Sequence, residues 1–103
     1  METYNPLDLS TQEDAEREAS ANSKKAQELE DQDFVWLMDN AQGRRTVWRL
    51  LNWTGVFRSS VNSDVTMMAF AEGNRNVGLR VWAQLHRLCP EKYLIMVNEN
   101  NGS

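Results

Sequence analysis

The sequence predicts an all-α fold, a small helical bundle of three to four helices preceded by an acidic N-terminal helix or arm. Helix-capping residues recur along the chain, and apolar side chains follow the 3, 4, 7 spacing of one helix face. No two alternating apolar segments are joined by a hairpin turn signal, and the sequence has no internal repeat. These observations favour helices packed on helices.

The chain changes in character near residue 33. Residues 1–33 carry ten acidic against three basic side chains, a net charge of −7. Residues 34–97 carry a net charge of +4, together with all four Trp and all three Phe. The sequence therefore divides into an acidic arm over 1–33, a basic, aromatic-rich helical domain over 34–97 and a flexible tail over 98–103.

The acidic arm is expected to begin with an irregular stretch and then to favour a helix. Asn5-Pro6 favours a turn, and Ser10 opens a capping box after which a helix-forming composition continues to the end of the arm. Leu29 is the only large aliphatic side chain in that helical stretch, so the arm has little to bury. It is either helical or disordered in the free protein. It is also either a solubilising extension or a helix that docks on a partner or a second copy.

Two helical segments are predicted over residues 34–53. The apolar run over 34–38 is expected to form the last turns of the arm helix, entering the core. Asp39-Asn40 then marks a break and a new cap, and a helix follows over about 41–53 with Gly55 as its stop. The apolar face of this helix is predicted to be Val47, Leu50, Leu51 and Thr54, and the polar face Arg45, Arg49 and Asn52.

A loop and the longest helix follow. Phe57 is expected to be a plug in the core, and Asp64 to cap a helix over about 65–88. Gly78 lies on the apolar face of that helix, which predicts the close approach of another backbone. Pro90 ends it and suits the first position of a last helix over about 91–98. The apolar stripe of the long helix is predicted to be Met67, Phe70, Ala71, Val77, Val81, Leu85 and Leu88.

Five sequence blocks of the helical domain occur in a defined order. They are Phe34–Met38, Gly43–Leu51, Gly55–Ser60, Met68–Arg80 and Cys89–Tyr93. Over about residues 33–97, this run resembles a family of small tailed-bacteriophage proteins of the type found in a Bordetella phage. The resemblance implies a gene among packaging, portal and capsid genes, and hence a virion component or assembly factor. It brings no catalytic residues with it.

Arginine dominates the basic charge of the helical domain, where seven Arg accompany one Lys. Arg is favoured over Lys where carboxylates or phosphates are held by two hydrogen bonds or where aromatic faces are stacked. Three interpretations remain open: a solvated face paired with the acidic arm, a surface for an acidic protein partner, and a surface for DNA. The net charge of −4 disfavours DNA. The predicted partner-binding residues are Arg44, Arg45, Arg49, Trp53, Arg58, Arg80, Trp82 and Arg87.

Two further expectations concern burial. The four Trp are expected to furnish the core, with Trp53 and Trp82 as the candidates for exposure as interface anchors. Arg75 is a candidate for burial in an ion pair, which would fix geometry more than it adds stability. Its candidate partners are Asp39, Asp64 and Glu72.

The sequence offers no catalytic or metal-binding constellation, so we expect the protein not to be an enzyme and to need no cofactor or metal. His86 and Cys89 lie three residues apart, but a Cys–His pair needs an orienting third group and an open, electropositive site. Cys89 is the single cysteine, so no disulfide forms within the chain, and no Cys/His cluster has zinc spacing.

We therefore expect a phage virion-associated structural or assembly protein that binds a portal, head or internal core protein, in multiple copies. The alternative is a small nucleic-acid-binding or regulatory phage protein. A core of about 64 residues rarely supplies more than ~3–5 kcal/mol, which favours self-association or docking on a larger partner. Without a signal peptide or a membrane span of ~20 apolar residues, we expect synthesis in the host cytoplasm and residence in the virion.

Overall fold

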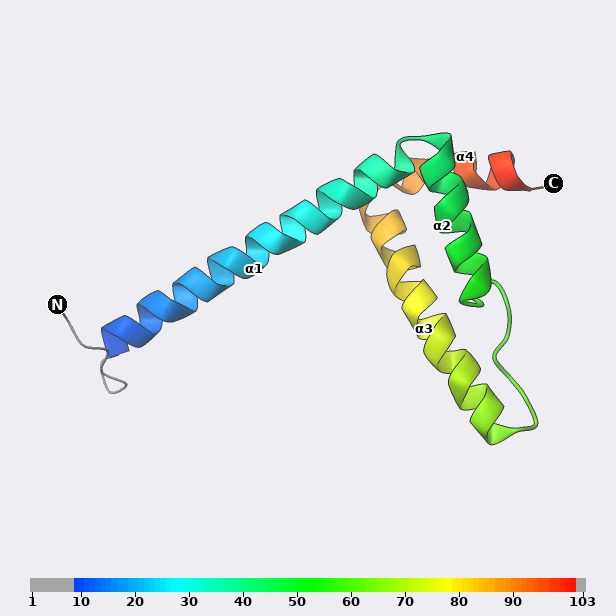
Figure 1. The fold of residues 1–103 in the computed structure, drawn as a ribbon, viewed down its shortest axis with the longest axis horizontal. Coiled ribbons are helices and arrows are strands. Elements are labelled where there is room, and N and C mark those ends of the chain that lie inside the picture. Colours follow the sequence, from blue (N-terminus) through cyan, green and yellow to red (C-terminus); the bar gives the residue numbers. More distant parts are fainter. Residues whose placement is uncertain (1–8, 102–103) are drawn as a thin grey trace. The chain divides into compact units, whose positions relative to one another are not determined.

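The computed structural model describes residues 9–101, which form four helices and no strand (Figure 1). The all-α class predicted from the sequence is therefore confirmed for this part of the chain. The turn expected at Asn5-Pro6 and the last tail residues, 102–103, lie outside the described residues. The chain divides into two compact units, which meet in the sequence between Gln32 and Asp33.

The first unit contains the N-terminal part of α1, a helix that spans Leu9–Met38. Side chains 13–30 are all exposed, as expected for a sequence with almost nothing apolar to bury. Arg17 and Asp14 form an exposed ion pair of 3.0 Å, which contributes little to stability. The capping box expected at Ser10 is wrong, because α1 already includes the residue before it and Ser10 lies inside the first turn.

The last turns of α1 belong to the second unit and enter its core, as predicted. Phe34 and Met38, one turn apart, are buried, whereas Trp36 is 70 % exposed. The expected core position of Trp36 is therefore wrong. A residue two places after Phe34 points about 200° away from it around the helix, so both cannot face the same core.

A tight corner leads into α2, which spans Ala41–Trp53. The Asn40 side-chain oxygen accepts a hydrogen bond from the Gly43 amide at 2.7 Å, which confirms the predicted cap. Gly43 is buried, and a β-carbon there would overlap the carbonyl oxygen of Leu37. The corner between α1 and α2 therefore requires glycine at this position.

The connection from α2 to α3 turns at Gly55 and is anchored by an aromatic ring. Gly55 has a φ of 79°, the left-handed conformation expected of a helix stop. Phe57 was expected to plug the core, but its side chain is 43 % exposed. Its ring packs instead beside Trp48 and Trp82, with centroid distances of 5.4 and 5.8 Å. Aromatic contact at the surface thus replaces burial as the anchor of this loop.

α3 spans Val65–Leu88 and begins at the predicted cap. The Asp64 carboxylate accepts hydrogen bonds from the amides of Thr66 at 2.9 Å and Met67 at 3.2 Å. Two of the orphan donors at the start of the helix are thereby satisfied.

The apolar stripe predicted for α3 is wrong in its first part. Met67, Phe70 and Val77 are exposed, whereas Gly78 and Leu85 are buried. The stripe was inferred from spacing alone, and spacing does not reveal where along its length a helix meets its neighbours.

Gly78 is the point at which α3 approaches the end of α2 most tightly. A β-carbon there would overlap the side chains of Thr54 and Val56, and would lie 2.8 Å from the Thr54 Cβ. The close approach predicted at Gly78 is therefore present, but the neighbouring atoms belong to side chains rather than to a backbone. This contact sets the rotation of α3, and the apolar residues on its other side are left in solvent.

α4 spans Pro90–Asn100, with Pro90 in its first turn as predicted. The helix is longer than expected, so residues 98–100, which were assigned to the flexible tail, are helical. The reason is Arg44, which donates to the Glu99 carboxylate from Nε at 2.5 Å and from Nη2 at 3.3 Å. The same guanidinium donates from Nη1 to the carbonyl oxygen of Met38 at 3.0 Å. The last turn of α4 is thereby tied to α2 and to the end of α1.

The core of the second unit lies among the end of α1 and the three helices that follow. α2 packs against both α3 and α4, and α3 packs against α4 (Figure 1). Each helix supplies few buried side chains, so the core is small and the contacts at the connections between helices are important for its stability. The buried residues are Phe34, Met38, Val47, Leu51, Leu85, Cys89 and Met96.

We predict that Gly73→Ala stabilises the second unit and that Gly78→Ala destabilises it. Both glycines lie inside α3, where Ala is favoured over Gly by ~1 kcal/mol. A β-carbon at Gly73 meets nothing within 4 Å, whereas one at Gly78 overlaps two side chains. Urea unfolding followed by circular dichroism should show a gain of about 0.5–1 kcal/mol and a loss of about 1–3 kcal/mol, respectively. Equal effects would contradict the close approach at Gly78.

We predict that Arg44→Met lowers the free energy of unfolding by about 1–3 kcal/mol, because it removes three hydrogen bonds, two of them to a charged group. The Arg44 and Glu99 side chains are 12 % and 31 % exposed, so solvent only partly compensates for the loss. Arg45→Met, at the neighbouring exposed position, is the matched control and should change stability by less than about 0.5 kcal/mol. Similar losses in the two variants would contradict the role assigned to Arg44.

Candidate functional site

The outward face of α2 brings together three of the predicted partner-binding residues. Arg45, Arg49 and Trp53 are spaced four residues apart, so they lie along one side of the helix. All three are exposed, Trp53 to 69 %, which confirms its predicted exposure. Neither arginine forms an ion pair or hydrogen bond with another residue in the described part of the chain. We call these three residues the α2 face.

Two other predicted residues use their guanidinium groups inside the chain. Arg44 is turned inward to Glu99 and the Met38 carbonyl, so it positions helices. Arg58 donates from Nη2 to the carbonyl oxygen of Asn52 at 2.8 Å and satisfies an acceptor at the end of α2. Arg44 therefore departs from its predicted role, and Arg58 has one nitrogen committed.

The remaining arginines of the predicted set lie on α3. Arg80 and Arg87 are seven residues apart and exposed, so they share a side of that helix. The predicted arginines are thus distributed over two helices and a loop, and only Arg45 and Arg49 follow one another along the same face as an exposed Trp.

The exposure expected of Trp82 is wrong. Its ring packs against Phe57 at 5.8 Å, His86 at 4.4 Å and Tyr93 at 4.9 Å between centroids. These rings come from the α2–α3 loop, from α3 itself and from α4. Trp82 therefore holds three segments together in an aromatic cluster, which leaves it partly buried.

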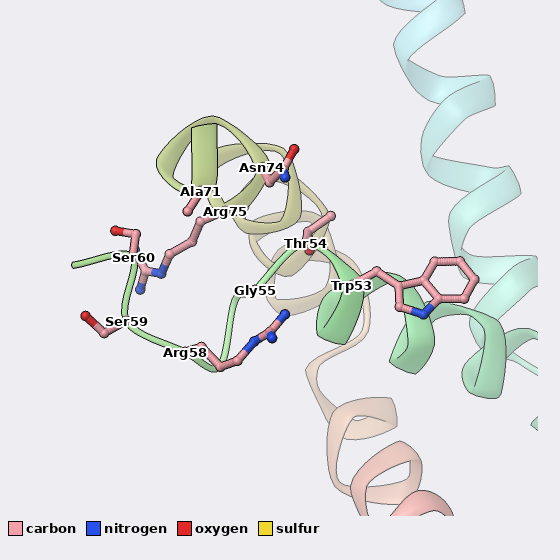
Figure 2. Close-up of a pocket in the computed structure, with 9 residues that line it drawn as sticks. All are labelled: Trp53, Thr54, Gly55, Arg58, Ser59, Ser60, Ala71, Asn74 and Arg75. Carbon is pink, nitrogen blue, oxygen red and sulfur yellow. The ribbon is translucent and has the colours of Figure 1, made fainter. Parts of the chain in front are cut away.

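A pocket of about 140 Å³ lies where the α2–α3 loop passes α3 (Figure 2). Its lining is largely polar, and it includes Trp53 of the α2 face, whose indole points away from the other lining side chains (Figure 2). The lining residues with polar side chains are Thr54, Arg58, Ser59, Ser60, Asn74 and Arg75.

Arg75 was a candidate for a buried ion pair with a carboxylate, and the described part of the chain contains no such pair. No ion pair joins it to any described acidic residue. Glu72, one turn earlier on α3, accepts a hydrogen bond from the Ser60 hydroxyl instead. Asp39 pairs with a lysine of α4 at 3.3 Å, and Asp64 caps α3. The Arg75 Nε atom is buried and has no hydrogen-bond partner among the described residues.

The sequence reasoning missed this pocket. Its polar groups come from two segments, 58–60 and 74–75, which only packing brings together. The available signal was the run Arg58-Ser59-Ser60, three successive side chains with hydrogen-bond donors in a predicted loop.

Two titratable side chains near the end of α3 take part in packing. His86 packs its ring against Trp82 and Tyr93, and Cys89 is buried. Burial raises the pKa of the Cys89 thiol, the charge of Glu91 raises it further, and Lys92 opposes both. At neutral pH this cysteine is therefore a neutral thiol, a poor nucleophile.

Residues 9–101 lack two further features. No group of three or more His, Cys, Asp or Glu side chains is placed to hold a metal ion. None of the four helices combines the length and the apolar character that crossing a membrane requires.

Comparison with known families places the chain in a class of small phage proteins. The family model for the Bbp19-like phage protein matches residues 34–98, more than half of the chain. The chain belongs to the Bbp19-like phage protein family, which confirms the resemblance found in the sequence. No curated protein and no solved structure matches it.

We predict that Cys89 makes the protein less stable above pH 9. The folded-state pKa of the thiol is raised above its ordinary value of 9.0, so the unfolded chain ionises first as the pH rises. The contribution of the neutral thiol to the free energy of unfolding is complete below pH 9.0. It is lost as the pH rises towards the folded-state pKa, by at most about 1.4 kcal/mol per pH unit. When unfolding is measured from pH 7 to 10.5, the free energy of unfolding should fall less steeply with pH in Cys89→Ala than in the natural chain. Parallel declines would contradict burial as the cause.

Proposed function

We propose that the chain is a virion-associated structural or assembly protein that binds a portal, head or internal core protein of its phage. The observation that carries this proposal is the α2 face, an exposed row of Arg45, Arg49 and Trp53. Trp and Arg are the residue types most over-represented at the energetic centres of protein interfaces.

The composition of this face favours a protein partner of mixed character. An exposed indole gains free energy when an apolar pocket covers it, by about 25 cal/mol per Å² of apolar surface. The two guanidinium groups beside it can each hold a carboxylate by two hydrogen bonds. A partner surface that alternates acidic side chains with an apolar pocket meets both requirements.

Assembly in multiple copies is part of the proposal. The second unit buries seven apolar side chains, while Trp36, Trp53 and Phe70 stay exposed. Such a small core gains stability from contacts made outside the chain. In a closed symmetric assembly, every copy makes equivalent contacts with its neighbours.

We also propose that the function is binding rather than catalysis. The two residues that could have formed a nucleophile and base, Cys89 and His86, serve in packing, and the thiol stays protonated at neutral pH. The exposed charge of the α2 face is of a kind that recognises a partner.

We predict that purified particles contain the chain at a fixed copy number, as measured by quantitative mass spectrometry before and after DNA ejection. Particles assembled with Arg45→Glu/Arg49→Glu or with Trp53→Ala should contain it at no more than a tenth of that number. The reason is that truncation of interface-centre residues costs about 2 kcal/mol or more. Trp36→Ala, at an equally exposed indole outside the α2 face, is the matched control and should be incorporated normally.

Two results would overturn the proposal. Absence of the chain from both mature particles and assembly intermediates would remove the virion role. Binding to DNA of any sequence that weakens steeply with salt, without capture of a phage protein, would support the nucleic-acid-binding alternative instead. Comparison of particles before and after ejection further separates an internal component from one that remains in the shell.

A further inference from the structure

Arg75 carries a buried N–H that nothing in the described part of the chain accepts. A buried donor without an acceptor costs about 1–3 kcal/mol, and more on a charged group. Glu72 is the carboxylate one turn away on the same helix, yet it accepts from Ser60. The chain therefore buries one nitrogen of the Arg75 guanidinium, while the neighbouring carboxylate accepts from another residue.

Other residues that line the same pocket also carry hydrogen-bond donors (Figure 2). Ser59 accepts a hydrogen bond from the Val61 amide at 3.2 Å, which leaves its hydroxyl proton free to be donated. Arg58 uses Nη2 for a backbone carbonyl and keeps its other N–H groups. Asn74 is also a lining residue. The chemistry that complements this lining is an anionic acceptor.

We propose that this pocket binds a carboxylate, the side chain of an Asp or Glu on the protein partner, with Arg75 as its anchor. The two Nη atoms at the end of the guanidinium form a fork that matches the two oxygens of a carboxylate, and neither of them is paired with a described residue. A volume of about 140 Å³ accommodates such a head group.

A carboxylate suits the pocket better than a phosphate does. Ser60, which lines the pocket, already donates to the Glu72 carboxylate, so a negative charge adjoins the site. This charge repels a phosphate dianion more strongly than a singly charged carboxylate. The net charge of the chain, −4, acts in the same direction.

The pocket deepens the proposed function, on which its biological role rests. Trp53 is a lining residue of the pocket and also ends the α2 face, so the pocket and the α2 face adjoin at this residue. The partner is then required to present an acidic side chain next to the apolar group that covers Trp53. This requirement identifies the class of partner segment as acidic protein rather than nucleic acid.

The test follows the arginine Nε–H signals of the full ¹⁵N-labelled chain by nuclear magnetic resonance. The probe is a blocked peptide of six glutamates, and the same peptide with six glutamines is its control. We expect the Arg75 signal, assigned by its loss in Arg75→Lys, to shift saturably with the glutamate peptide and to stay unchanged with the glutamine peptide. Acetate and inorganic phosphate should each require at least tenfold higher concentrations for the same shift.

Matched variants separate the fork from simple charge. Arg75→Lys keeps the charge but lacks the fork, and should weaken the glutamate peptide at least fivefold, as followed by the backbone amides of residues 58–60. Arg17→Lys makes the same change at an exposed position of α1, outside the predicted partner-binding residues, and should leave binding unchanged. If Arg75→Lys does not fold, the titration of the natural chain decides alone.

Three results would overturn the proposal. An Arg75 signal insensitive to both glutamate peptide and acetate would mean that no carboxylate binds at Arg75. Binding of phosphate more tightly than of the glutamate peptide would point to a phosphate site. Acetate binding as tight as the peptide would point to a free small carboxylate in place of a protein segment. Because the titration contains no particle, a failed incorporation experiment leaves its outcome unchanged.

Discussion

One guanidinium group holds the second unit together. Arg44 donates to both oxygens of the Glu99 carboxylate and to the carbonyl oxygen of Met38. It thereby joins the last turn of α1, the first turn of α2 and the last turn of α4, three places where helix ends would otherwise present unsatisfied groups. Because the Arg44 side chain is only 12 % exposed, water compensates only in part when these hydrogen bonds break. The length of α4 and the position of the core follow from this contact.

The packing around that contact relies on glycine at two crossings. At Gly43 the end of α1 passes so closely that a β-carbon would meet its backbone, and at Gly78 the side chains of Thr54 and Val56 occupy the equivalent space. Such close crossings let few side chains fill the core. The remaining large apolar side chains stay at the surface, among them the indole of the α2 face. The small core and the exposed binding surface thus have a common origin, and a partner that covers Trp53 adds stability that the core does not provide.

Local sequence signals predicted where the helices begin and end better than they predicted which face of each helix is buried. Asn40, Asp64, Gly55 and Pro90 marked the boundaries because caps and stops depend on nearby backbone groups. The buried face of α3 depends instead on the contact between Thr54 and Gly78, which forms only when the chain folds. For this reason Phe70 was predicted to be buried, whereas it is exposed. The same distinction applies to the site. The spacing of Arg45, Arg49 and Trp53 is a property of one helix and could be predicted. The pocket at Arg75 needs the loop to fold over α3, and the inward turn of Arg44 needs Glu99, 55 residues away.

The tryptophans occupy two environments, and this gives the protein an optical record of its own state. Trp48 and Trp82 lie in the aromatic cluster, where Tyr93 is 4.9 Å from the Trp82 ring and can pass its excitation to that indole. Trp36 and Trp53 face solvent and emit at longer wavelengths. A partner bound to the α2 face excludes water from Trp53 and shifts the emission of Trp53 to shorter wavelengths. Unfolding exposes the aromatic cluster to water and shifts the emission to longer wavelengths. Intrinsic fluorescence therefore distinguishes an occupied protein from an unfolded one by the direction of its change, without any label.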